Sequence, residues 1–503
     1  MNTNSSDTHR GDETEDAFRA LIGSLAQDYF PEFQPKDTGK AQDMGPPLGW
    51  EPVDGDWVRA IGDAPDSCEG PNNVYGGKTD YSGLSPLNVP AEILPASFDL
   101  QSVRGDFPIL SEKINGKRLI WFDNAATTQK PRCVIDRLRY YYEHENSNVH
   151  RSAHTLAGRT TDAYEEARRK IASFIHASDP GEIVFIRGAT EGINLVAQSY
   201  ARKHLSRGDE VLITLLEHHA NIVPWQTICR QTGAELKVVP VDETGQVILS
   251  EYGRCLSPRT RIVAFAHVSN VLGTITPAEE MVHMAHRYGA RVLMDGAQAA
   301  AHMPVDVVAL DCDFYVFSGH KTFGPMGIGV LYGKADILES MEPYQGGGSM
   351  IEDVTMERTR YRRPPYRFEA GTGSIADAIA LGTAIDYLSG LDLTAIAAYE
   401  DGLLRYATEK LSRIPWITLV GTAQPKTAIL SFALKNIPSD DLGKALDGEG
   451  IAVRAGHHCA QPILRRYGYE DTVRASLALY NTRAEIDDMT DALWRITRDY
   501  TGL

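Results

Sequence analysis

From about residue 100 onward, short apolar runs alternate with longer stretches in which apolar residues recur at helical spacing. The runs at 182–187 and 210–215 are strand-like, and each is followed by a helical pattern, the second beginning near Ile222. Strands that alternate with helices are typical of a mainly parallel sheet covered by helices. The pattern therefore predicts an α/β fold for the main body of the chain.

The pattern changes after residue 374. Two long helical patterns lead into short strands and a final helix rich in Asp and Arg; the helices are at 375–389 and 393–412, the strands at 428–433, 451–454 and 474–479. This order predicts a large domain at 97–374 and a smaller α+β domain at 375–503. The N-terminal part of the large domain is expected to be able to pack on the small one.

Residues 1–96 differ from the rest in charge and texture. Residues 1–99 hold 18 acidic and 6 basic side chains, a balance of 6 − 18 = −12, which leaves −5 of the total of −17 for the rest of the chain. Gly, Pro, Asn and Ser interrupt any apolar periodicity, so we interpret 1–96 as a largely disordered extension.

One short amphipathic helix is predicted inside this extension, at about residues 15–30. Its apolar face comprises Phe18, Leu21, Ile22, Leu25 and Tyr29,. We interpret this helix as an element that docks on a separate partner, by the logic of a helix that binds in a groove. Packing on the enzyme body of the same chain is the alternative.

Composition excludes several classes of protein. With 503 residues, 43% of them hydrophobic, the chain can bury a large core, but it has no apolar run of 18 residues and is not expected to span a membrane,. The acidic chain has no basic stripe for nucleic acid. The six cysteines lack disulfide or metal spacing and no secretory signal precedes them, which indicates a reducing cytoplasm,.

Lys321 and Asp295 are the first candidate site residues. Lys321 follows the strand-like run 314–317 among small and hydroxyl neighbours, and Asp295 ends the apolar run 292–294. Lys321 alone is most simply a solvated loop lysine. A lysine paired with a buried carboxylate is what pyridoxal 5'-phosphate (PLP) requires, for its aldehyde and its pyridinium nitrogen. The pair therefore predicts a PLP enzyme.

A phosphate site is predicted where the strand at 182–187 gives way to a helix. Backbone N–H groups and the Thr190 hydroxyl can converge on one anion there,. An ordinary capped helix start is the alternative, but Ser318 and His320 flank the lysine and can supply further donors. His218 follows another strand, where an imidazole can stack on the pyridine ring and handle protons.

Cys459 is the candidate nucleophile. It follows His457 and His458, and nearby histidines can favour the thiolate, although an inert core cysteine is the alternative,. The chain has two pairs of adjacent histidines, His218-His219 and His457-His458, which raises the question of a zinc site. Neighbouring side chains on an extended chain point in opposite directions and no second cysteine lies at ligand spacing, so no metal is predicted.

From about residue 98 to its end, the chain resembles group II cysteine desulfurases of the SufS type, which are fold-type I PLP enzymes. The resemblance rests on short motifs at 123–127, 149–151, 187–194, 217–225, 267–270, 295–298, 318–321, 346–350 and 454–459. It departs from the family at Ala189, where these enzymes often carry a second hydroxyl residue, and in the long acidic extension. Loss of one hydroxyl would cost about 1 kcal/mol of phosphate binding.

The resemblance implies a role for each candidate residue. Lys321 would form the Schiff base with PLP, and the other cofactor contacts would come from Thr190, His218, Asp295, Gln298, Ser318, His320 and, in the partner subunit of a homodimer, Thr372. Arg474, Asn270 and Arg454 would bind the substrate, L-cysteine. Cys459 would take its sulfur as a persulfide, releasing L-alanine and passing the sulfur to a SufE-like or SufU-like acceptor, as in iron–sulfur cluster assembly.

Two questions stay open at this point. A selenocysteine lyase or an aminotransferase would also keep Lys321 and Asp295 but needs no thiol at Cys459. An enzyme-like scaffold protein that has lost activity is a further alternative, against which the complete set of cofactor residues argues. The extension resembles the cargo-loading arms of desulfurases packaged in encapsulin shells, which would place the protein inside a nanocompartment within the cytoplasm. A scaffold-docking arm and a dispensable solubility tail are the alternatives.

Overall fold

The computed structural model describes residues 99–150 and 153–501 of the chain. The predicted extension at 1–96 and its helix at about 15–30 lie outside these residues. The first described elements are short: α2 (Leu100–Gly105), β1 (Lys113–Ile114), β2 (Lys117–Arg118) and β3 (Ile120–Trp121).

A seven-stranded sheet follows, with the strand order β4-β10-β9-β8-β7-β5-β6. Its strands are β4 (Ile183–Ile186), β5 (Glu210–Thr214), β6 (Glu235–Val239), β7 (Thr260–Ala266), β8 (Arg291–Asp295), β9 (Phe314–Ser318) and β10 (Gly329–Gly333). β10 runs antiparallel to both of its neighbours, and every other pairing in the sheet is parallel. The prediction of a mainly parallel sheet is confirmed.

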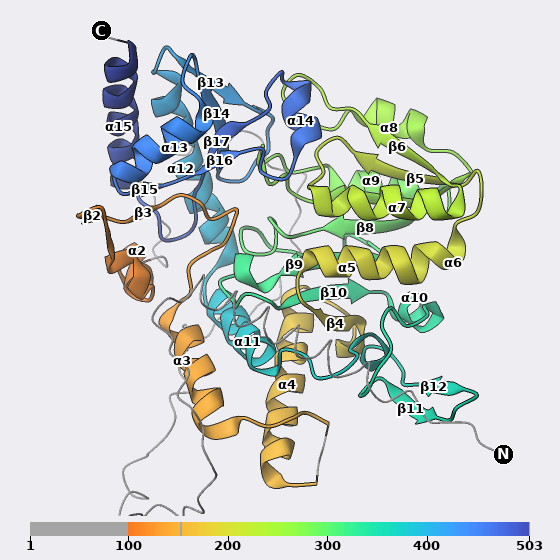
Figure 1. Cartoon of the computed structure of the whole chain (residues 1–503). Helices are drawn as coiled ribbons and strands as arrows, with labels where there is room; N and C mark the ends of the chain where they lie inside the picture. Colours follow the sequence, from red (N-terminus) through yellow and green to blue (C-terminus); the bar gives the residue numbers. More distant parts are fainter. Residues whose placement is uncertain (1–98, 151–152, 502–503) are drawn as a thin grey trace, which may run out of the picture. The chain divides into compact units, whose positions relative to one another are not determined.

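Helices cover both faces of this sheet, as Figure 1 shows. The helices of this part of the chain are α3 (Arg132–Tyr140), α4 (Thr155–Phe174), α5 (Ala189–Leu195), α6 (Arg202–His204), α7 (Val223–Thr232), α8 (Leu249–Cys255), α9 (Ala278–His286), α10 (Ala335–Ser340) and α11 (Ile375–Ser389). Successive strand residues point to opposite faces. Val211 and Ile213 accordingly pack in the core beside α5 and α7, whereas Leu212 packs beside α8 and α9. A strand buried on both sides explains why Val211, Leu212 and Ile213 are all apolar, with no alternation,.

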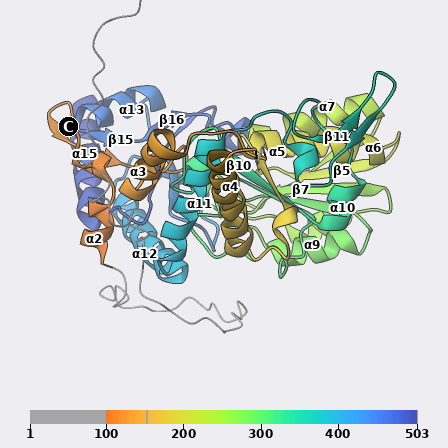
Figure 2. The same cartoon turned by 90° about the horizontal axis from the view of Figure 1, so that it is seen from below.

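Helix α11 packs against α3 and α4, and Figure 2 shows the three side by side. The next helix, α12 (Leu393–Ser412), begins four residues after α11 ends, and both helices have the predicted bounds. No single described helix is both long and apolar enough to span a membrane; α11 and α12 pass that test only as a pair, which is bent by 78°.

A four-stranded antiparallel sheet occupies the last part of the chain, with the order β13-β14-β17-β16. Its elements are β13 (Ile417–Val420), β14 (Ile429–Leu434), β16 (Arg454–Gly456) and β17 (Thr472–Ser476), with α13 (Ser439–Gly448), α14 (Gln461–Arg466) and α15 (Arg483–Thr501). Phe432 and Val473 point from this sheet into a core that also holds α12, α13 and α15 residues. A two-stranded hairpin, β11 (Ile351–Val354) and β12 (Thr359–Tyr361), lies outside both sheets.

The strand predicted at 451–454 is two strands in different sheets. β15 (Ile451–Ala452) pairs in parallel with β3, whereas β16 pairs with β17. The change of partner occurs at Val453, because β3 arrives from the beginning of the described chain and pairs only with the first two residues. Sequence periodicity could not show this, since the partner lies more than 300 residues away.

Candidate active site

The side chains that the sequence singled out meet at one edge of the seven-stranded sheet. A cavity of about 210 Å³ opens beyond the ends of β5, β7, β8 and β9. Ten of the predicted residues line it: Thr190, His218, Asn270, Asp295, Gln298, Ser318, His320, Lys321, Arg454 and Arg474. Ligands of open α/β sheets bind at the carboxyl ends of the strands, so the location is that of a binding site.

Lys321 lies in the short turn directly after β9, and Asp295 ends the neighbouring strand β8. Burial lowers the pKa of Lys321 to about 8; the charge of Asp295 opposes this shift, and two cavity arginines reinforce it. Burial raises the pKa of Asp295, against the backbone N–H of Ala297, which donates to it at 3.0 Å, and the charge of Lys321. The site therefore holds an amine that loses its proton far more easily than a surface lysine.

The beginning of α5 is packed closely against the end of β9. The N–H of Ala189 donates to Ser318 Oγ at 2.9 Å, and a Cβ on Gly188, whose φ is 154°, would lie 3.2 Å from the same oxygen. The missing side chain lets the two backbones approach. As a result Thr190, Ser318 and His320, which the sequence assigned to one phosphate, line one cavity.

His218 follows β5 and is a neutral imidazole at physiological pH. Burial lowers its pKa to about 3, and the charge of Lys321 acts in the same direction. The N–H of Ala220 donates to His218 Nδ1 at 3.0 Å. Glu217 beside it is fully buried; burial raises the pKa of its carboxyl to about 8, and the Asn221 side chain donates to it at 2.6 Å.

Arg474 lies on β17 of the four-stranded sheet, and its side chain also lines the cavity. Its guanidinium donates to Asn270 O at 2.8 Å and to Asp123 Oδ1 at 3.0 Å. Burial lowers its pKa to about 10, with the charge of Asp123 opposing the shift, so the side chain stays a cation. Arg474 Nε and Asn270 Oδ1 are buried without a hydrogen-bond partner among the described residues. A donor and an acceptor are thus left for a ligand.

Cys459 lies beside the cavity, and it is not among the residues that line it. Its Sγ is 3.9 Å from Nη2 of Arg454, which does line the cavity. The cysteine is half-buried, and it and His458 have left-handed backbone angles, with φ of 56° and 52°. The N–H of His219 donates to the carbonyl of Cys459 at 2.7 Å. This contact connects the cysteine loop to the segment that carries His218.

Comparison with known proteins decides the family. A model of the family described as "Aminotransferase class-V" matches residues 120–489. The chain belongs to this family. Among aminotransferase class-V proteins it resembles a cysteine desulfurase of Synechococcus elongatus, at 61% identity over 79% of this chain and 64% of that protein. A cysteine desulfurase of Dickeya dadantii is 49% identical over 82% of this chain and 99% of that protein.

Solved structures agree with this placement. The cysteine desulfurase CsdA (S-sulfonic acid) of Escherichia coli aligns with a TM-score of 0.74 at 38% identity, over 79% of this chain and 98% of that one. The predicted fold, that of fold-type I PLP enzymes in the aminotransferase class-V family, is thereby confirmed. This chain spans 63–66% of the length of three curated relatives that are 56–61% identical to it.

Thr372 is the one predicted cofactor residue that lies away from this cavity. It lines a second cavity, of about 390 Å³, together with residues such as His150, Arg362 and Glu369. The amide of Asn148 donates to Thr372 Oγ1 at 3.4 Å. Thr372 therefore does not line the cavity that holds Lys321 in the same chain. Its predicted contact with the phosphate in a partner subunit stays a prediction.

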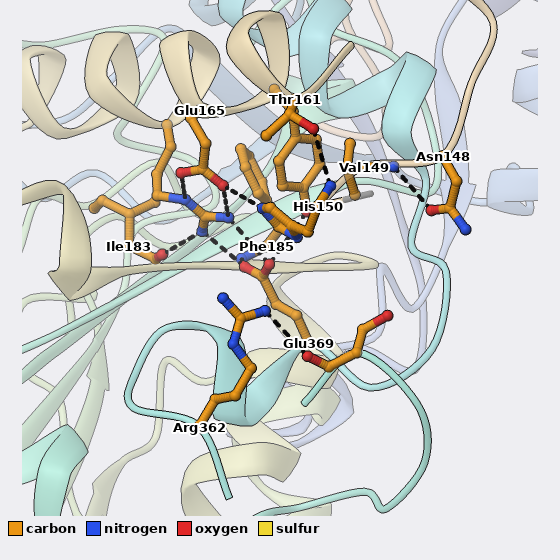
Figure 3. A network of polar contacts seen from close by, with 12 residues as sticks. Asn148, Val149, His150, Thr161, Glu165, Ile183, Phe185, Arg362 and Glu369 are labelled. Atoms are coloured by element: carbon orange, nitrogen blue, oxygen red, sulfur yellow. Dashed lines mark hydrogen bonds and ion pairs between the residues drawn. The ribbon is translucent and has the colours of Figure 1, made fainter. Parts of the chain in front are cut away.

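A buried ion-pair network holds one side of this second cavity, and Figure 3 shows its carboxylates and histidine converging. Arg168 pairs with Glu369 at 2.7 Å and with Glu165 at 2.9 Å, and Glu165 also contacts His150 at 2.9 Å. Despite burial, the hydrogen bonds from His150 and Arg168 hold the pKa of Glu165 at about 2. Glu369, three residues before Thr372, further accepts the N–H of Phe185 at 2.8 Å. The network therefore joins α4, β4 and the Thr372 loop.

Two residues escaped the sequence analysis, Asp123 and Lys130. Asp123 belongs to a family motif at 123–127 but received no role; it pairs with Arg474 at 3.0 Å. Lys130 Nζ donates to the carbonyl of His320 at 3.0 Å, and the Thr128 N–H donates to the same oxygen at 3.0 Å. Burial lowers the pKa of Lys130 to about 7. These donors hold the peptide that directly precedes Lys321. The sequence signal that could have pointed to Lys130 was its position between the 123–127 motif and Pro131.

Proposed function

We propose that this chain is a PLP-dependent cysteine desulfurase that converts L-cysteine to L-alanine and retains the sulfur as a persulfide on Cys459. The observation that carries the proposal is the joint placement of a buried amine, a buried carboxylate and a buried guanidinium in one cavity, with a partly exposed thiol beside it. The named relatives support it, since aminotransferase class-V proteins at 49–61% identity are called cysteine desulfurases.

The residues of the cavity fit PLP and an amino acid. Lys321 is a depressed-pKa amine for the aldehyde, and Asp295 is a buried carboxylate for the pyridinium nitrogen,. The free Arg474 Nε and Asn270 Oδ1 are polar atoms that a bound substrate would satisfy,. Further cofactor contacts are assigned to Thr190, His218, Gln298, Ser318 and His320, which line the same cavity.

When bound, PLP supplies an electron-accepting ring that stabilises negative charge at the substrate Cα. Arg474 orients the substrate carboxylate through charge-assisted hydrogen bonds. The Lys321 amine takes the Cα proton, because burial lowers its pKa to about 8 and so makes the neutral form available near that pH,. Neutral His218 contributes a flat, uncharged wall.

The sulfur step belongs to Cys459. Its thiolate attacks the sulfur of the substrate, the carbon–sulfur bond breaks, and its electron pair returns to the alanine skeleton, which is then protonated. L-cysteine and the thiol of Cys459 give L-alanine and a Cys459 persulfide, so atoms and electrons balance. The guanidinium of Arg454, which lines the cavity, lies 3.9 Å from Sγ and so places the thiol next to the bound substrate.

We assign the protein to the SufS-type group II, with a homodimer in which Thr372 contacts the phosphate in the partner subunit. The position of Thr372 in a separate cavity supports this assignment, since that residue does not reach the cavity of its own chain. The acceptor of the persulfide would be a SufE-like or SufU-like protein. Exposure of Cys459 supports delivery to such a protein.

The test is turnover of L-cysteine by the purified, PLP-loaded protein with a reductant, with alanine and sulfide measured separately. We expect equal amounts of both products, because each turnover releases one of each. D-cysteine serves as the control substrate, since it cannot place its Cα proton and its carboxylate correctly at the same time. A protein that carries PLP and yields no alanine from L-cysteine would refute the proposal.

For residues 1–96 we propose recruitment to a larger assembly, specifically loading into an encapsulin shell. The support is the acidic charge and the predicted amphipathic helix at about 15–30. Deletion of 1–95 should leave turnover within about twofold of the native chain, because the cavity residues all lie later in the chain,. The same deletion should abolish co-assembly with a co-expressed shell protein. A collapse of turnover would instead assign the extension to the enzyme.

A further inference from the structure

Three potential metal ligands from two distant segments meet next to the cavity. They are His219, His457 and Cys459, and their candidate ligand atoms all lie within 4.8 Å of one another. Among the described residues, this is the group of histidine, cysteine and acidic side chains that meets the spacing of a metal site. Each histidine belongs to a different His-His pair. No metal was predicted from the sequence, because adjacent histidines point in opposite directions and no second cysteine lies at ligand spacing; the fold instead brings one ring from each pair to the thiol,.

Backbone contacts fix how the two rings are presented. His457 Nδ1 accepts the N–H of Cys459 at 3.0 Å, and His219 Nε2 accepts the N–H of Gln461 at 3.4 Å. Ring centroids of the two histidines are 5.6 Å apart. A lone pair on each ring is therefore directed at the same short stretch of chain that carries the thiol. Each of these lone pairs accepts a backbone N–H, so a metal ion that binds them must replace both contacts; the one at 3.4 Å is long and costs little to replace, and the one at 3.0 Å costs more,.

We propose that His219, His457 and Cys459 form a binding site for a thiophilic divalent ion such as Zn²⁺, and that occupancy of this site reversibly inhibits the enzyme. One thiolate and two imidazoles are a zinc ligand set, with the fourth tetrahedral position left to water or substrate. Binding replaces the thiol proton, which is released to solvent, and no oxidation or reduction takes place.

The geometry requires only a modest contraction. Zinc ligands lie about 2.0–2.3 Å from the metal, so tetrahedral ligands are about 3.5 Å apart. The three atoms must therefore approach one another by about 1 Å. His457 is exposed and Cys459 is half-buried, so both side chains can adjust. The guanidinium of Arg454, 3.9 Å from Sγ, disfavours a cation and limits the affinity,.

Inhibition follows from the role proposed for Cys459, and this part of the inference rests on the proposed function. A thiolate bound to Zn²⁺ cannot attack the substrate sulfur or accept it as a persulfide. Metal binding itself does not depend on turnover. Binding and inhibition can thus be measured separately, and a failure of one does not imply a failure of the other.

The experiment measures alkylation of Cys459 by iodoacetamide in the PLP-loaded protein, peptide by peptide, with a phosphine reductant that does not chelate metal. We expect Zn²⁺ to slow alkylation of Cys459 by about tenfold or more and to leave the half-exposed Cys255 unchanged,. Mg²⁺, which prefers oxygen ligands, should protect neither cysteine. Turnover of L-cysteine, measured without iodoacetamide in matched samples at the same free Zn²⁺ concentrations, should fall as the protection of Cys459 rises.

Variants decide whether the histidines hold the metal. His219→Ala and His457→Ala should each raise the Zn²⁺ concentration for half-protection by about tenfold, and the double variant should lose protection. His283→Ala, an exposed histidine on α9, is the matched control and should behave as the native chain. His457→Ala removes only an exposed ring, so folding is preserved. Equal protection in the double variant, or no protection in the native chain, would overturn the proposal.

Discussion

The two chemical groups of this site sit in opposite surroundings. The cavity floor, Asp295 and Lys321, lies at the ends of adjacent strands of the seven-stranded sheet, where burial shifts the pKa of both groups. The cavity rim consists of Arg454, the first residue of β16, and Cys459, in the loop after that strand. The cysteine is half-buried and has a left-handed backbone. One half of the site is fixed by a packed core and the other by a few loop contacts.

The difference matches the two tasks in the proposed reaction. Proton removal at Cα needs an amine whose pKa has been lowered, and burial supplies that shift. Sulfur delivery to a second protein needs a thiol that another molecule can reach, so Cys459 cannot be buried in the same way. Removal of the Cα proton at the floor should therefore proceed without the rim thiol, whereas sulfur transfer to the rim thiol should not proceed without the floor.

The largest effect is expected for the floor. Lys321→Ala should lower both desulfuration of L-cysteine and exchange of the Cα proton of L-alanine by at least about a thousandfold, because the proton acceptor is gone. Exchange is followed by NMR in D₂O with PLP added in excess. If exchange survived in this variant, a residue other than Lys321 would have to remove the Cα proton.

Removal of the rim thiol should separate the two halves. Cys459→Ala should lose desulfuration by about a hundredfold or more and keep Cα exchange within a few-fold of the native rate. Some turnover of selenocysteine should also remain, since selenide leaves more readily than sulfide. Sulfide, selenide and exchange are measured on one preparation. Equal loss of all three would show that the halves are not independent.

Arg474→Lys should act on both halves through the substrate. A lysine keeps the charge but loses the bidentate guanidinium, so kcat/KM for L-cysteine should fall by about tenfold to a hundredfold, mainly through KM. Steady-state rates at several L-cysteine concentrations give the division between kcat and KM. If only kcat fell and KM stayed unchanged, the proposal that Arg474 binds the substrate carboxylate would be wrong.

A smaller effect is expected behind the floor, at Lys130. Lys130→Met removes one donor to the carbonyl of His320 and should lower kcat by about tenfold, with KM little changed,. Lys130→Gln keeps an N–H donor without the charge and should recover part of the loss. Hydrogen exchange of the peptide at 319–323 reports on the position of the Lys321 turn directly. Native exchange in Lys130→Met would exclude a positioning role.

The smallest effect concerns pH. Because burial lowers the pKa of Lys321 from 10.5 to about 8, the neutral amine is present at lower pH than for an exposed lysine. Cα exchange in Cys459→Ala should rise with pH, reach half of its maximum near pH 8 and level off about one pH unit higher, and this variant excludes titration of the rim thiol,. A rate that continued to rise toward pH 10 would show that the amine is not perturbed in the working enzyme.

Local sequence signals were sufficient for most of the fold. Strands buried on both faces give continuous apolar runs, and helices give a period near four, so β5, β9, α11 and α12 were found at or near their bounds,. The strand predicted at 451–454 is two strands, which the sequence did not show because the partner of the first, β3, is two residues long and distant in sequence. The division into domains and the roles of the site residues stay predictions.

The sequence by itself determined the chemistry that the chain can carry: a lysine after one strand, a carboxylate at the end of another and a cysteine after two histidines, in motifs that are recognisable one at a time. Only the tertiary structure decided what those groups meet. Burial set the pKa of Lys321 and His218, Lys130 came to hold the peptide before Lys321, and His219 came within reach of His457 and Cys459. A motif is a local property of the chain and can be recognised in the sequence alone, whereas burial and long-range contacts depend on how distant segments pack together.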